Sequence, residues 1–259
     1  MADQTEQHNE ETAPEQHKER GLIEDFLGDI LNLDRGLPGT IWLMLKSPHE
    51  VVNSFFAVPK KYVNPFRYTI ILTTITTFIS VQFIDYEEMM KSAMDAGGDS
   101  ADVIAGLQEQ IPTFDWQLYF DNLLFISTVL IEKYAAINYI VLFAPMLALS
   151  TFLLFRKHMP KYKQHFVMNL YGISTLSLFG IIWALLVPLL EQSSVFEGLL
   201  YTIIPTTLYC CWVIFSSLGF KTIKGFLGAL AGFFLGYMFY SIILTIVMYF
   251  GAFVMTMAG

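Results

Sequence analysis

The sequence predicts an all-α integral membrane protein with five transmembrane helices, a cytoplasmic N-terminus, an outside C-terminus and a small cytoplasmic helical platform. Three observations lead to this fold class. Of the 259 residues, 54% are hydrophobic and only 15% are charged, whereas a soluble domain carries charge on about a quarter of its residues. Apolar stretches of membrane-spanning length recur after residue 64. Nearly all lysines and arginines fall in the connections that this layout places in the cytoplasm.

The N-terminal part of the chain is water-soluble in character. Residues 1–21 are acidic and polar, which predicts a disordered tail, and they contain no apolar core of the kind a signal peptide needs. Residues 22–64 are predicted to form the helical platform. Within it, residues 22–33 make an amphipathic helix with an acidic polar face, which anionic lipid would repel. We expect this helix to pack on its neighbour or to dock on the basic cytoplasmic face of its own chain.

The membrane domain is predicted to cover residues 65–259. Asn64-Pro65 has the form of a helix start, with Asn as the N-cap and Pro in the first turn, and no charged residue follows between Arg67 and Asp85. An acidic loop, 85–134, is assigned to the outside and contains an interfacial helix at 116–131 that is too short to span. The predicted spans are 66–84, 135–155 (kinked at Pro145), 166–190, 199–218 and 226–250.

The sequence offers little for catalysis. The predicted spans carry no ionisable residue away from their ends, which argues against proton-coupled transport. The chain lacks the short motifs of hydrolases, metalloproteases and phosphate-binding loops. Cys210 and Cys211 are adjacent in an apolar run, so they cannot pair with each other without strain and are expected to be buried. We therefore predict no enzyme, no catalytic residues, no metal site, no cofactor and no nucleic-acid partner.

Two sets of residues are predicted to bind or pack. The first is a basic face for anionic lipid headgroups on the cytoplasmic side, or for a protein partner: Lys60, Lys61, Arg67, Lys161, Lys163 and His165. The second is a glycine stripe with two consecutive Gly-xxx-Gly steps, Gly228, Gly232 and Gly236. Such a stripe lets two helix backbones approach closely. Packing within one chain is favoured over a seam between two copies.

The leading functional hypothesis is a non-catalytic scaffold that recruits a partner through the cytoplasmic platform. The alternative is a transporter or channel for a small neutral or lipid-like solute. That alternative uses the hydroxyl and amide side chains of the spans, and a continuous polar path joining Thr73, Asn138 and Asn169 would favour it. Thr and Ser also bond their own helix carbonyls, so simple packing explains the same residues.

Two stretches of the chain resemble an uncharacterised, domain-of-unknown-function family of bacterial membrane proteins. They are the run Leu37 to Tyr68, LPGTIWLMLKSPHEVVNSFFAVPKKYVNPFRY, and the patch YKQHFVMNLY at 162–171. The similar positions are Thr40, Leu45, Pro48, Lys60, Lys61, Tyr62, Pro65, Phe66, Arg67, Tyr68 and His165. The resemblance implies a polytopic protein of the bacterial inner membrane, with no established reaction. Many family members begin with a zinc-ribbon Cys-x-x-Cys, which the acidic tail replaces here. The layout is also similar to that of the Yip-type membrane proteins, an analogy of architecture alone.

Overall fold

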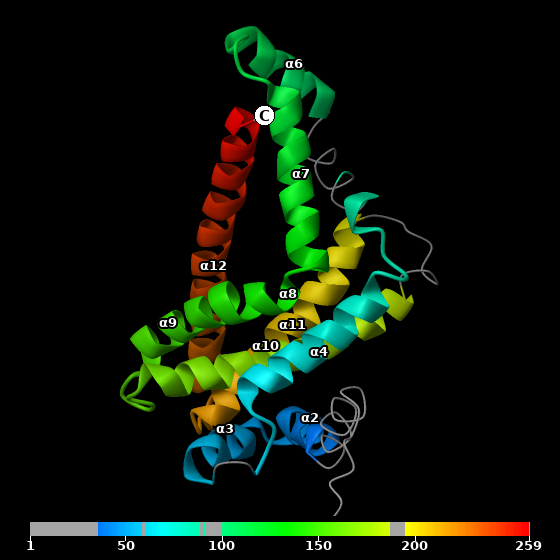
Figure 1. Cartoon of the computed structure of the whole chain (residues 1–259). Helices are drawn as coiled ribbons and strands as arrows, with labels where there is room; N and C mark the ends of the chain where they lie inside the picture. The colour runs from blue at the N-terminus through cyan, green and yellow to red at the C-terminus, as the bar shows by residue number, and fades with distance from the viewer. Residues whose placement is uncertain (1–35, 59–60, 89–90, 92–99, 187–194, 259) are drawn as a thin grey trace, which may run out of the picture. The chain divides into compact units, whose positions relative to one another are not determined.

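The structure is a computed structural model that describes residues 36–58, 61–88, 91, 100–186 and 195–258. All regular secondary structure in these ranges is helical, which confirms the all-α prediction. The predicted tail and the amphipathic helix 22–33 lie outside the described residues. In chain order (Figure 1) the elements are α2 (Leu37–Lys46), α3 (Pro48–Ala57), α4 (Pro65–Ser80), α6 (Ser100–Gln110), α7 (Trp116–Glu132), α8 (Ala135–Ile137), η2 (a π-helix, Asn138–Phe143), α9 (Ala144–Phe155), α10 (Tyr162–Leu186), α11 (Val195–Ser217) and α12 (Ile223–Ala258).

Within the described residues, three helical segments are long and apolar enough to cross a membrane: Ala135–Phe155, which joins α8, η2 and α9, Tyr162–Leu185 in α10, and Ile223–Ala258. One predicted span forms a shorter helix. Helix α4 has 16 residues, which give roughly 24 Å of helix against a hydrocarbon core of about 30 Å. Helix α11 has 23 residues, and the apolar segment found among its described side chains is Ile203–Ser217.

Local sequence accounts for several helix boundaries. Asn64 caps α4 as predicted, because its Oδ1 accepts a hydrogen bond from the Phe66 amide at 3.0 Å and Pro65 occupies the first turn. A π-helical turn, η2, directly precedes Pro145. Proline has no N–H to donate to the preceding turn, and a widened turn is one way in which a helix continues past it. The turn between α11 and α12 contains Gly219, whose φ of +68° favours glycine.

Helix α10 lies at the centre of the described helices. It packs against α4, α9 and α11, and also against the platform helices α2 and α3. Its residues Met168, Leu170, Tyr171 and Ile173 are almost completely buried. From Gly36 onward the chain forms one compact unit, so the platform shares a core with the membrane helices.

Helix α12 has 36 residues and packs against α9, α7, α11 and η2. Its first half contacts α9, and its second half runs beside α7 (Figure 1). In the second contact Tyr119 and Leu123 pack around Ala252, and Asn122 donates a hydrogen bond to the Thr256 hydroxyl at 3.1 Å. The helix continues through Gly251 without a break and extends beyond the predicted end of the span at residue 250.

The glycine stripe of α12 faces α9 of the same chain. A Cβ atom on Gly236 would lie 2.5 Å from the Ser150 Oγ and 2.8 Å from the Leu147 Cα. At Gly232 the nearest atom is a ring carbon of Phe155 at 3.0 Å, and at Gly228 it is another at 3.4 Å. The close approach also lets Ser150 donate a hydrogen bond to the Gly232 carbonyl at 2.8 Å. The stripe therefore brings α9 and α12 together.

Replacing Gly236 by alanine is expected to destabilise the protein by about 1–3 kcal/mol, because the backbone of Leu147 cannot move aside for the new methyl group. The matched control is Gly228→Ala, where the methyl group would make ordinary contact with Phe155. Thermal unfolding of both variants in mild detergent checks this expectation. Equal melting temperatures for the two variants would contradict it.

Candidate functional site

Most described cations gather at one end of the helices, which we call the basic end. Aromatic contacts bring its segments together: Phe66 at the start of α4 lies 5.8 Å from Phe166 in the first turns of α10, between ring centroids. Phe155 at the end of α9 lies 5.4 Å from Phe220 in the α11–α12 turn. The described cations of this end are all exposed: Lys61, Arg67, Arg156, Lys157, Lys161, Lys163, Lys221 and Lys224.

Acidic residues follow the other end of α4. The stretch 85–132 contains Asp85, Glu87, Glu88, Asp102, Glu109, Asp115, Asp121 and Glu132 among its described residues. Lys91 and Lys133 are the described cations of the predicted loop 85–134, and Lys91 pairs with Glu87 at 2.6 Å. The hydrogen bond to the carboxylate raises the pKa of Lys91. The two ends of α4 thus differ in the sign of their surrounding charge.

The platform is fixed to the basic end by buried contacts. Met44 of α2 and Val51 and Val52 of α3 belong to the main hydrophobic core. The Tyr209 hydroxyl of α11 donates to the Met44 carbonyl at 3.2 Å, and the Tyr171 hydroxyl of α10 donates to the Val63 carbonyl at 2.5 Å. These bonds satisfy platform carbonyls with side chains of membrane-length helices, so the platform is held in one position on them.

The described residues leave one face of α2 uncovered. Gly39, Trp42, Leu45 and Lys46 recur at helical spacing on this face, which we call the α2 stripe. The side chain of Trp42 is 65% exposed and that of Leu45 is 40% exposed, while Met44 on the opposite face is fully buried. Helix α2 therefore anchors itself through one face and presents the other.

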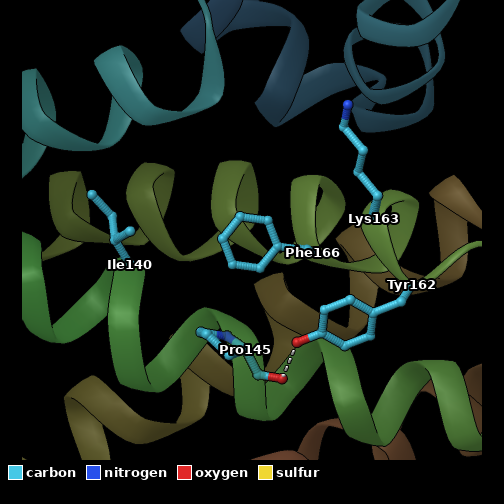
Figure 2. Close-up of a pocket in the computed structure, with 5 residues that line it drawn as sticks. All are labelled: Ile140, Pro145, Tyr162, Lys163 and Phe166. Carbon is cyan, nitrogen blue, oxygen red and sulfur yellow. Dashed lines mark hydrogen bonds between the residues drawn. The ribbon is translucent and has the colours of Figure 1, made fainter.

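A groove of about 420 Å³ lies between η2, the start of α9 and the first turns of α10 (Figure 2). Its lining residues are Ile140, Pro145, Tyr162, Lys163 and Phe166, and we call it the α9–α10 groove. The Tyr162 hydroxyl donates to the Pro145 carbonyl at 3.1 Å and ties the two walls together. Figure 2 shows Phe166 between Tyr162 and Ile140, with the amine of Lys163 pointing away from Tyr162.

The residues predicted for the basic face do not all share a surface. Lys61, Arg67, Lys161 and Lys163 are exposed, and the Lys61 amine lies 5.1 Å from the ring centroid of Tyr62. Lys60 lies outside the described residues. His165 is 0% exposed, so its ring does not contribute to the exposed basic face.

His165 instead joins α9 to α10. Its Nε2 donates to the Met159 carbonyl at 2.8 Å, and its Nδ1 lies 3.1 Å from the Thr151 hydroxyl. Asn169, one turn further along α10, donates to the same hydroxyl at 3.1 Å and to the His165 carbonyl. The four-residue spacing of His165 and Asn169 was the sequence signal for this buried polar pair, because residues four apart share a helix face.

The polar residues of the alternative solute path lie in separate contacts. Thr73 donates to the Thr69 carbonyl of its own helix at 2.7 Å, Asn138 donates to the Tyr240 hydroxyl at 3.0 Å, and Asn169 belongs to the His165 pair. Other hydroxyls of α4 bond across to α10: Thr69 with Ser174 at 2.6 Å and Tyr68 with Thr175 at 2.8 Å. These side chains hold helices together.

Within the described ranges, no group of three or more His, Cys, Asp or Glu side chains is placed to hold a metal ion. Cys210 and Cys211 are free thiols, and both are buried. Comparisons of the chain with protein-family models, with curated proteins and with solved structures give no match. The function therefore has to be argued from the geometry above.

Removing the imidazole of His165 is expected to lower stability by about 1–3 kcal/mol, because the Met159 carbonyl loses its donor inside the protein. The matched control is His158→Ala, which removes an exposed imidazole from the connection between α9 and α10. Thermal unfolding in mild detergent should show a large loss for His165→Ala and a small one for the control. Equal small losses would show that the buried bonds contribute nothing.

Proposed function

We propose that this chain is a non-catalytic, multi-pass protein of the bacterial inner membrane that acts as a scaffold. In this proposal five spans place the N-terminus in the cytoplasm and the C-terminus outside, and the platform recruits a protein partner beside a basic face that binds anionic lipid. The observation that carries the proposal is the α2 stripe, where the apolar side chains of Trp42 and Leu45 are exposed. The opposite face of α2 is buried against α10 and α11, and the Tyr209 hydroxyl of α11 bonds to the Met44 carbonyl.

The distribution of charge supports the proposed orientation. The exposed cations of the basic end sit beside the platform, and the acidic stretch follows the far end of α4. Positively charged connections are retained in the cytoplasm, so the platform belongs on the cytoplasmic side. Beyond Ser80, α4 is continued by a turn in which the Ile84 amide donates to the Ser80 carbonyl, and this adds apolar length to a short helix.

The hydrogen bonds that the buried polar side chains make inside the protein support a non-catalytic role. His165, Asn169 and Thr151 bond one another or nearby carbonyls, and the hydroxyls between α4 and α10 are paired. Groups engaged in this way join helices and are not directed at a substrate. In this proposal the bacterial inner membrane comes from the resemblance of 37–68 to bacterial membrane proteins; Thr40, Pro48, Pro65 and Tyr68 from that run are buried.

The orientation is tested by cysteine labelling with a membrane-impermeant maleimide. Cys210 and Cys211 are buried, so the wild-type chain should give a low background. The reagent reaches the cytoplasmic side in inside-out vesicles, where Lys161→Cys and Lys224→Cys should be labelled. It reaches the outer side in intact cells, where only Asp102→Cys and Glu109→Cys should be labelled. Labelling of Lys161→Cys and Glu109→Cys from the same side would contradict the proposed topology.

The scaffold role is tested by affinity purification of the full-length chain from mild detergent. Deleting the platform would remove Met44, Val51 and Val52 from the core, so exposed side chains are the better targets. The double variant Trp42→Ala/Leu45→Ala should lose a partner that copurifies with the wild type. The control, Ile223→Ala, alters a side chain that is 80% exposed outside the platform and should keep that partner. Equal recovery in both variants would contradict recruitment through the α2 stripe.

A further inference from the structure

The α9–α10 groove has an apolar wall with one cation, Lys163, at its edge; the Lys163 amine points away from Tyr162 and Pro145 (Figure 2). Ile140, Pro145 and Phe166 form the wall, and Lys163 lies at the start of α10. Its volume of about 420 Å³ falls within the usual range of small-molecule sites, about 300–1,000 Å³. A fitting occupant therefore has an apolar part that covers the wall and a negatively charged group that reaches the lysine.

The position of the groove selects a lipid as that occupant. Its walls come from Ala135–Phe155 and Tyr162–Leu185, both of which are long and apolar enough to cross a membrane. A groove between two such helices is reached by the molecules of the bilayer. We propose that the α9–α10 groove binds one anionic glycerophospholipid, with an acyl chain against Ile140, Pro145 and Phe166 and the phosphate at Lys163. This inference rests on the proposed membrane orientation, because it needs Lys163 at the level of the headgroups.

The charges around the groove favour an anionic headgroup. Lys161 lies two residues before Lys163, and Arg156 and Lys157 are exposed in the turn that precedes them. The first turn of α10 contains no acidic residue, and the N-terminus of a helix carries partial positive charge. The Tyr162 hydroxyl already donates its proton to the Pro145 carbonyl. Tyr162 is therefore a positioning residue for the groove wall, and Lys163 supplies the charge that recognises the phosphate.

The test is native mass spectrometry of the full-length, delipidated protein with phosphatidylglycerol or phosphatidylcholine of the same acyl chains. We expect one tightly held phosphatidylglycerol that phosphatidylcholine does not replace. Lys163→Gln should weaken this binding about fivefold, the contribution of one lysine near an anionic headgroup. Ile140→Phe should weaken binding of the same lipid by filling the groove. Lys221→Gln, which removes one charge from the basic end outside the groove, should leave it unchanged.

Three results would overturn the proposed lipid site. Equal weakening by Lys163→Gln and Lys221→Gln would overturn the groove as a site, while lipid binding by the basic end as a whole would stand. Equal binding of the two lipids by the wild type, or unchanged binding in Ile140→Phe, would also overturn the inference. Size-exclusion profiles matching the wild type show that each variant is folded. The proposed orientation is decided separately by the cysteine labelling.

Discussion

The structure depends on one constraint: polar side chains on a helix that crosses a membrane must find hydrogen-bond partners inside the protein, because the hydrocarbon core offers none. Helix α10 carries many such groups on its buried faces. His165 and Asn169 bond to α9 through Thr151, and Ser174 and Thr175 bond to α4 through Thr69 and Tyr68. Helices α9 and α4 are thereby held against α10, which makes α10 the centre of the fold. Of the residues that suggested a solute path, Asn138 and Asn169 bond across to α12 and α9, whereas Thr73 bonds a carbonyl of its own helix.

Buried hydrogen bonds also hold the platform. Carbonyls at Met44 and Val63 accept hydrogen bonds from tyrosines of α11 and α10, and Met44, Val51 and Val52 enter the common core. A domain attached by a flexible linker would move freely over the membrane surface. This platform is held at the basic end, so the exposed face of α2 keeps a fixed position relative to the lysines and arginines around it. A fixed, partly apolar face beside a cationic surface is what the proposed scaffold requires.

Local sequence predicted those features of the fold that depend on neighbouring residues. Asn64 and Pro65 define the start of α4 because the cap and the first turn involve only residues two positions apart. The apolar runs predict membrane-length helices at Ala135–Phe155 and in α10 and α12, because composition and length are properties of the segment itself. The predicted first span, 66–84, is longer than the regular helix, which ends at Ser80. Hydropathy shows where charged residues begin again, but it does not show where the helical hydrogen bonding of the backbone ends.

What the sequence determined by itself is the class of the molecule: an all-helical protein with apolar segments long enough for a membrane and with cations and acids in separate connections. What only the tertiary structure decided is which residues meet. His165 follows two lysines and was grouped with them, yet it turns inward, because the side chain of a helical residue is placed by its helix face and not by its sequence neighbours. The sequence also did not determine which helix packs against the glycine stripe. Its assignment to α9 rests on contacts with Ser150 and Leu147, residues more than eighty positions away, which no local pattern encodes.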